Sequence, residues 1–290
     1  MAPRKPRLKV GDKIGADLTV LAPIDVSSSD PVYLAWHQQA WCPMACKLYA
    51  SPRRSRREAR ILSRLSHPNV VRFLGVSHGG GVLTEFLEGP GLRRLIDEHA
   101  NGLDLSDAMR IAVHVGAALR HVHDRGYLHL DVKPSNIIIA RGRPVLFDFD
   151  CARRITAARP PHVAGTEPYI APEECLRRRA TRASDVFGFG VLLYEMLTGK
   201  LPFAAGTTRN PFPQIRAHPV PIRRRLPSIP AALAELVGSC LAGDPSMRPS
   251  LDTLLPKLNG FIASGARMWP DSFSPTRQRD PRRSGTRLAA

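Results

Sequence analysis

Four polar residues near the middle of the sequence could act together on a phosphate group. Asp131, Lys133 and Asn136 share the segment HLDVKPSN, and Asp148 follows in FDFD. A carboxylate can accept the proton of a hydroxyl group, and an ammonium group can neutralise the oxygens of a phosphate in transfer. An amide oxygen and a second carboxylate are ligands that Mg²⁺ prefers. Asp131 and Lys133 are therefore candidate catalytic residues, and Asn136 and Asp148 are candidate metal ligands.

Two apolar runs between these residues predict how the metal ligands meet. Residues 137–139 and 145–147 are joined by ARGRP, whose glycine and proline favour a turn, so the runs should pair as a β-hairpin. Pairing would place Asn136 and Asp148 at one rim of the hairpin, with Asp131 on the loop that leads into it.

The elements expected before residue 88 form a small sheet with one helix. Short apolar stretches alternate with turn formers, which is the pattern of antiparallel strands. Apolar residues at helical spacing after the basic stretch 53–57 predict one helix, which Pro68 would end. Five strands are expected, at residues 18–24, 32–36, 42–49, 70–76 and 81–87.

Beyond residue 88 the pattern is mainly helical. An apolar stripe from Ile111 to Val122 predicts a helix that Ser106 or Asp107 could cap. A second helix is apolar enough that it should be buried on all sides. This second helix and a third are expected at residues 185–197 and 231–241.

At these residues the chain resembles the protein kinase family. His129, Leu130 and Asp131, with Asn136 five positions later, match the pattern H-R-D-x-x-x-x-N, and the segment 148–150 stands where D-F-G is expected. The other matches are Gly165-Thr166-x-x-Tyr169, Ala171-Pro172-Glu173, Asp185 and Arg248 in DPSMRP. The resemblance implies an α+β, two-lobed protein kinase fold over residues 14–262, with an antiparallel sheet and one helix in an N-lobe (14–87) and a mainly helical C-lobe (88–262).

The resemblance also implies ATP and Mg²⁺ as cofactors. Lys47 in ACKLY would contact the α- and β-phosphates, and Glu58 would hold Lys47 in place. The backbone of Glu85 and Phe86 would bind adenine, beside Thr84. Further implied pairs are Leu62 with Phe149, in the apolar spine between the lobes, and Glu173 with Arg248, in a buried ion pair.

The glycine-rich loop of the family is replaced by the segment DVSSSDPV at residues 25–32. Ser27, Ser28 and Val32 of this segment are candidate cofactor-binding residues, and the serine hydroxyls could donate hydrogen bonds to phosphate. Glycine normally lets the backbone approach phosphates closely, whereas Asp25 and Asp30 bring negative charge. A carboxylate about 6 Å from a phosphate charge costs about 3 kcal/mol at an effective dielectric near 20, so weak nucleotide binding is expected.

Two further departures concern regulation and metal binding. Leu130 replaces the arginine that in many kinases reads a phosphorylated activation loop, and Thr156 is the one hydroxyl between Asp150 and Gly165. Control by activation-loop phosphorylation is therefore not expected. Asp150, in place of glycine, adds a carboxylate near the metal that could bind the metal or disturb it.

Three functions remain open from the sequence. Lys133 in DVKPSN and Thr166 resemble serine/threonine kinases, so the leading hypothesis is transfer of the ATP γ-phosphate to protein hydroxyls. The lost glycines motivate a pseudokinase that acts as a binding or scaffolding module. A small-molecule phosphotransferase is the third hypothesis, because Asp148-x-Asp150 resembles a motif of the kinase-like superfamily.

Composition bounds the partners and the location. The formal charge is +17, but aromatic residues make up only 6%, so a nucleic-acid partner is not expected. No membrane segment is expected, because the longest apolar run, 186–194, is too short to cross a bilayer. The basic N-terminal extension 1–13 lacks the apolar stretch of a secretion signal, which favours a cytoplasmic location. The basic tail 263–290 is expected to be disordered, and it could contact acidic partners.

Overall fold

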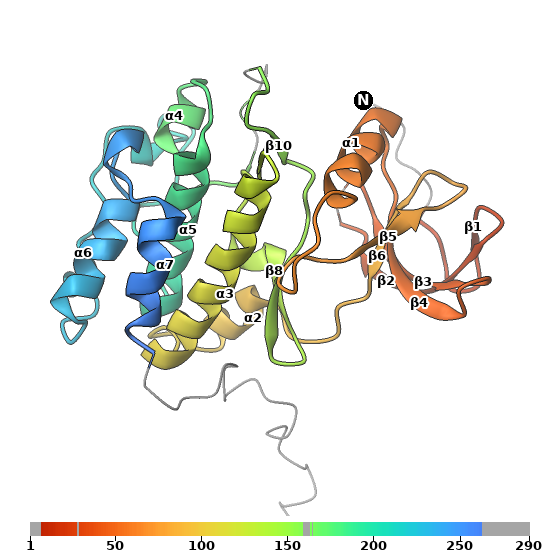
Figure 1. Cartoon of the computed structure of the whole chain (residues 1–290), viewed down its shortest axis with the longest axis horizontal. Helices are drawn as coiled ribbons and strands as arrows, with labels where there is room; N and C mark the ends of the chain where they lie inside the picture. Colours follow the sequence, from red (N-terminus) through yellow and green to blue (C-terminus); the bar gives the residue numbers. More distant parts are fainter. Residues whose placement is uncertain (1–6, 28, 159–162, 164, 263–290) are drawn as a thin grey trace, which may run out of the picture.

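The protein folds as two lobes that lie side by side (Figure 1). The computed structural model describes residues 7–27, 29–158, 163 and 165–262, so the expected disorder of the tail lies outside the described residues. The N-lobe carries an antiparallel sheet and one helix, and the C-lobe is mainly helical. The expected α+β, two-lobed fold is confirmed. Among the described residues, no helix has the length and apolar character needed to span a membrane.

The N-lobe sheet has six strands in the order β1-β2-β3-β4-β6-β5. Its strands are β1 (Lys13–Ile14), β2 (Leu18–Asp25), β3 (Val32–His37), β4 (Cys42–Lys47), β5 (Phe73–Val76) and β6 (Val82–Glu85). Five of them match the expected strands. Strand β1 was not predicted, because two residues are too few for an alternating pattern. On β3, Tyr33 and Ala35 point into the core, and the hydroxyl of Tyr33 accepts a hydrogen bond from the amide of Leu8 at 3.0 Å.

Helix α1 (Pro52–Leu62) lies between β4 and β5 in the sequence. It includes the basic stretch 53–57, which was expected to precede the helix. This expectation was wrong because arginine is a good helix former and proline is well tolerated in the first turn. Five residues of α1 are buried: Ser55, Glu58, Ala59, Ile61 and Leu62.

The C-lobe is built around α3 and α5, which contact each other. Helix α5 is buried along almost its whole length, as expected from its apolar sequence. A capping box formed by Thr181 and Ser184 starts it, and Gly199 ends it with a positive φ of 65°. The α-helices of this lobe are α2 (Leu92–Asp97), α3 (Leu105–Asp124), α4 (Pro172–Cys175), α5 (Arg182–Thr198), α6 (Ala231–Cys240) and α7 (Leu251–Asn259).

Sequence reasoning placed the three longest of these helices and missed the three shorter ones. Helix α3 has Asp104 at its N-cap, so Ser106 and Asp107 lie inside the first turn and not at the cap. The helices α2 and α4 have only six and four residues, too few to show helical periodicity. Helix α7 was obscured by Pro256.

The expected hairpin forms from β8 (Ile137–Ala140) and β9 (Arg143–Leu146). Its register pairs Ile137 with Leu146 and Ala140 with Arg143. The amide of Phe147 donates to the carbonyl of Asn136 at 3.0 Å, so the ladder continues to the rim that carries the polar residues. Both strands are largely buried against the C-lobe core.

Candidate active site

The loop that carries Asp131 is fixed by a buried carboxylate of α5. The Oδ atoms of Asp185 accept hydrogen bonds from the amides of His129 (2.9 Å) and Leu130 (2.7 Å). His123 of α3 binds the same carboxylate through Nε2 at 2.8 Å. Leu130 adopts a positive φ of 63°, which two amide contacts to one carboxylate help to hold. The loop is therefore anchored directly before Asp131.

Asp131 offers one oxygen that its neighbours leave free. Its Oδ2 atom binds Lys133 Nζ at 2.8 Å and accepts from Asn136 Nδ2 at 2.9 Å. Lys133 Nζ also donates to Thr166 Oγ1 at 2.5 Å. The Oδ1 atom is buried and has no hydrogen-bond partner among the described residues. A buried acceptor without a partner costs free energy, and the hydroxyl of a substrate would satisfy it.

Asn136 and Asp148 lie on the same cleft at the hairpin rim. The amide nitrogen of Asn136 is engaged by Asp131, which leaves its oxygen as the free end. The side chain of Asp148 is one-third exposed, so one face of the carboxylate is open. An amide oxygen and a carboxylate fit Mg²⁺. The described residues contain no cluster of three or more His, Cys, Asp or Glu suited to a metal.

Lys47 joins the two lobes at this point. Its Nζ atom lies 2.6 Å from Asp148 Oδ1 and 3.7 Å from Glu58 Oε2. Burial would lower the pKa of Lys47, but Glu58 and Asp148 together raise it, so the ammonium stays charged. Burial raises the pKa of Glu58 to about 7 against the opposing effect of Lys47. The Oε1 atom of Glu58 also accepts from the amide of Phe149 at 3.0 Å.

A cleft of about 560 Å³ opens between the lobes at these residues. It is large enough for a nucleotide, since small-molecule sites span about 300–1,000 Å³. Most of the expected cofactor-binding residues line it, namely Val32, Lys47, Glu58, Glu85 and Phe86. Ser27 does not line the cleft, because its amide and hydroxyl both donate to Asp25 Oδ1. Ser28 lies outside the described residues.

The loop that replaces the glycine-rich segment carries a carboxylate, Asp30, that lines the cleft and is paired within the protein. Asp30 is only 4% exposed, and its Oδ1 accepts from the amide of Ala50 at 2.9 Å. Its Oδ2 lies 2.6 Å from Nη1 of Arg54 on α1. Sequence reasoning did not find this partner, because the spacing of Arg54 from Asp30 carries no motif. The charge expected to repel phosphate at residue 30 is thus compensated within the protein.

Asp150 is likewise bound by α1. Its carboxylate contacts both Arg54 and Arg57, and its carbonyl oxygen also accepts from Arg57. The second carboxylate that the sequence placed near the metal is therefore directed to two arginines.

Comparisons with known proteins agree with this geometry. Residues 28–257 match the family described as "Protein kinase domain". The chain belongs to this family. It is 34% identical over 209 residues to the serine/threonine-protein kinase PkaA of Streptomyces coelicolor, covering 68% of this chain and 38% of that protein. It is 31% identical over 205 residues to the serine/threonine-protein kinase PrkC of Bacillus subtilis, covering 68% and 31%. The kinase domain thus spans well under half the length of these relatives.

A solved structure supports the fold. The kinase domain of Mycobacterium tuberculosis PknI aligns with a TM-score of 0.70 at 24% identity, covering 88% of this chain and 100% of that chain. This likeness concerns the arrangement of the two lobes.

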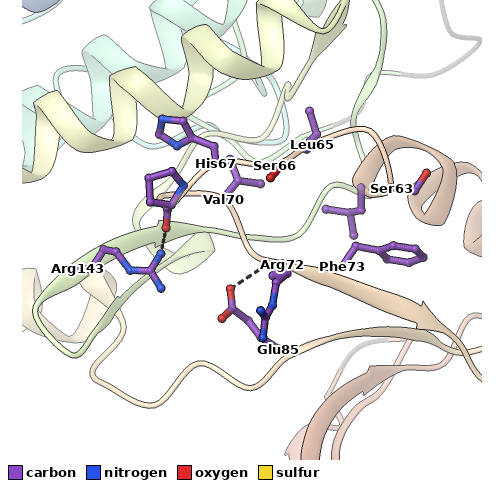
Figure 2. Close-up of a pocket in the computed structure, with 11 residues that line it drawn as sticks. Ser63, Leu65, Ser66, His67, Val70, Arg72, Phe73, Glu85 and Arg143 are labelled. Carbon is purple, nitrogen blue, oxygen red and sulfur yellow. Dashed lines mark hydrogen bonds between the residues drawn. The ribbon is translucent and has the colours of Figure 1, made fainter. Parts of the chain in front are cut away.

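A second cavity of this kinase domain shares Leu62 and Glu85 with the cleft, and Figure 2 shows the residues that line it. It measures about 530 Å³. The Oε1 atom of Glu85 accepts from the amide of Arg72 at 2.9 Å, and Arg143 contacts the carbonyl of Pro68 at the other side of the cavity (Figure 2). Glu85 is therefore held by Arg72 twice, since its own amide also donates to the carbonyl of Arg72 at 3.0 Å.

A buried ion pair holds the segment that carries Glu173. Arg248 forms a two-point ion pair with Glu173, at 2.8 and 2.9 Å, as the resemblance implied.

Leu130 packs in a small apolar cluster with Leu128, Ala180, Cys151 and Ile155. Burial, with nearby carboxylates, raises the pKa of the Cys151 thiol to about 12, so this thiol stays protonated near neutral pH.

Proposed function

We propose that this kinase domain transfers the γ-phosphate of ATP to serine and threonine hydroxyls of proteins. The observation that carries the proposal is the unpartnered Oδ1 of Asp131, next to the contact between Lys133 and Thr166. A hydroxyl donor fits there, and Lys133 lies close enough to Asp131 to reach the phosphate on that hydroxyl. The relatives named as serine/threonine-protein kinases support the substrate class.

In this reaction the substrate hydroxyl donates its hydrogen bond to Asp131 Oδ1 and attacks the γ-phosphorus. The bond from the γ-phosphorus to the β–γ bridging oxygen breaks, ADP leaves, and Asp131 takes the proton. Lys47 and Lys133 offset the negative charge on the phosphate oxygens. Mg²⁺, held by Asn136 and Asp148, would supply further charge neutralisation on those oxygens.

The remaining assignments belong to the same proposal. Val32 and the backbone of Glu85 and Phe86 hold the base, and Glu58 positions Lys47. The kinase domain covers residues 14–262, with the lobes divided near residue 88.

The test is phosphate transfer by the purified full chain with labelled Mg-ATP. Basic proteins, acidic proteins, and aminoglycosides or choline are offered in separate reactions. We expect label on protein serine or threonine, and a loss of about 10²–10⁴-fold in the rate for Asp131→Asn. Asp124→Asn, at an exposed position near the end of α3, should keep the wild-type rate.

Two results would overturn the proposal. Nucleotide binding without transfer to any acceptor would indicate a pseudokinase. Transfer to small molecules alone would indicate a small-molecule phosphotransferase.

A further inference from the structure

Arg54 of α1 contacts two carboxylates that lie far apart in the sequence. Its Nη1 atom is 2.6 Å from Asp30 Oδ2, and its Nε atom is 3.2 Å from Asp150 Oδ1. Its Nη2 atom also contacts Asp150, which makes that pair two-pronged. One guanidinium therefore links the loop before β3, the helix α1 and the segment that follows Phe149.

Both partners of Arg54 stand where the family pattern has glycine. Glycine could form neither ion pair, so the two substitutions and Arg54 make one arrangement. Arg54 is also four residues before Glu58, so the two side chains share a face of α1. Glu58 binds the amide of Phe149 at 3.0 Å and Arg54 binds Asp150, so successive turns of α1 contact successive residues of the segment.

We infer that Arg54 is a positioning residue for nucleotide binding. This inference rests on the phosphotransfer function proposed above. By holding Asp150 together with Arg57, Arg54 keeps α1 in the place where Glu58 reaches Lys47. By holding Asp30, it compensates the negative charge of that carboxylate in the lining of the cleft. Arg54 thereby compensates for the missing glycines at both positions.

The geometry explains why a lysine would not serve equally well. The planar guanidinium has five donors, and it addresses two carboxylates at once while binding one of them at two points. An ammonium is a point charge on a flexible stem and would satisfy one carboxylate at a time. Arg54→Lys should therefore keep the charge near Asp30 and Asp150 and lose part of the linkage.

The test compares Arg54→Ala and Arg54→Lys with Arg56→Ala in the full chain. Arg56 lies on the same helix, is exposed and has the same charge, so it controls for the loss of a basic residue. Two readouts are measured: the dissociation constant of Mg-ADP, and hydrogen exchange of the amides in 52–62. We expect Arg54→Ala to weaken Mg-ADP binding by about fivefold to thirtyfold and to speed exchange in α1. In both readouts, Arg54→Lys should fall between Arg54→Ala and the wild type, and Arg56→Ala should match the wild type.

A second comparison tests whether Arg54 acts through its two partners. In a chain that already carries Asp30→Asn and Asp150→Asn, adding Arg54→Ala should change exchange and binding less than twofold. Full additivity, or an Arg54→Ala protein that behaves like Arg56→Ala, would overturn the inference. Hydrogen exchange needs no nucleotide, so it tests the role of Arg54 even if the wild-type chain fails to bind Mg-ADP. Failure of the wild-type chain to bind Mg-ADP would count against the proposed function instead.

Discussion

Lys47 forms its shorter ion pair with Asp148, at 2.6 Å, and the longer one, at 3.7 Å, with Glu58. The oxygen of Asp148 that Lys47 occupies belongs to the carboxylate proposed to bind Mg²⁺. Metal binding should therefore compete with this ion pair and release Lys47 toward the phosphates. Mg²⁺ and nucleotide are then expected to bind cooperatively.

The variant Asp148→Asn should remove this cooperativity. We expect Mg²⁺ to strengthen ATP binding to the wild type by about tenfold or more, within the usual range of coupling between two ligands. In the variant, the neutral amide binds Mg²⁺ weakly and no longer forms an ion pair with Lys47, so Mg²⁺ should have almost no effect on ATP binding. Calorimetry with and without Mg²⁺ measures the ATP affinity of both proteins. Asp97→Asn, an exposed carboxylate of α2, is the control, and an unchanged Mg²⁺ effect in Asp148→Asn would contradict the assignment.

Nucleotide affinity should depend on pH through Glu58. Since burial raises the pKa of Glu58 to about 7, lowering the pH below that value protonates Glu58 and ends its attraction for Lys47. Affinity for ATP should fall as the pH drops from about 8 to about 6. Glu58→Gln should bind more weakly at pH 8 and lack this component, while titration of the nucleotide phosphates affects both proteins alike. Parallel pH profiles would contradict the prediction.

The raised pKa of Glu58 makes the stability of the fold change with pH in the opposite direction to nucleotide affinity. The folded-state pKa of Glu58 lies above the value of 4.5 for an ordinary glutamate, so folding takes up a proton between the two values. The contribution of Glu58 to the free energy of unfolding should therefore decrease as the pH rises from about 4.5 to about 7. Urea unfolding of the wild type and Glu58→Gln across this range measures it.

Arg248→Ala should destabilise the C-lobe strongly. The side chain of Arg248 is 0% exposed, and its removal leaves the carboxylate of Glu173 buried without its cation. Such a loss costs about 3–5 kcal/mol in the free energy of unfolding. Arg120→Ala breaks an exposed pair with Asp252 and should cost less than about 1 kcal/mol. Urea unfolding of both variants gives the comparison, and equal losses would count against the prediction.

Leu130→Arg restores the residue typical of the family but should not activate the protein. Leu130 is 5% exposed among Leu128, Cys151, Ile155 and Ala180, so a guanidinium there enters an apolar site. We expect a loss of about 2 kcal/mol or more in stability and no gain in the rate of transfer. Leu130→Met, of similar volume, should cost less than about 1.5 kcal/mol. A more active Leu130→Arg protein would show that the cluster limits catalysis.

The sequence predicted those parts of the site that depend on local spacing. Asp131, Lys133 and Asn136 lie within six residues, and the hairpin that follows has a clear alternation of apolar runs and turn. The structure accordingly brings Lys133, Asn136 and Asp148 onto one cleft. Asp131 contacts both Lys133 and Asn136. The sheet strands and the longer helices were predicted for the same reason, since their periodicity extends over enough residues.

Pairs that form across long distances in the sequence could not be predicted in this way. Arg54 and Asp150 are 96 residues apart, and nothing in the local pattern distinguishes Arg54 from the arginines beside it. From the sequence alone, the carboxylate of Asp30 is therefore predicted to repel the phosphates. Only the position of α1 against the loop shows that this carboxylate is paired.

The hydrogen bond from the amide of Leu8 to the fully buried Tyr33 bears on how the domain can be shortened. A protein that starts at residue 14 keeps every strand from β2 onward but deprives the Tyr33 hydroxyl of its donor inside the N-lobe core. Expression of the isolated domain should therefore begin at or before residue 7, even though no residue of the cleft lies in that segment.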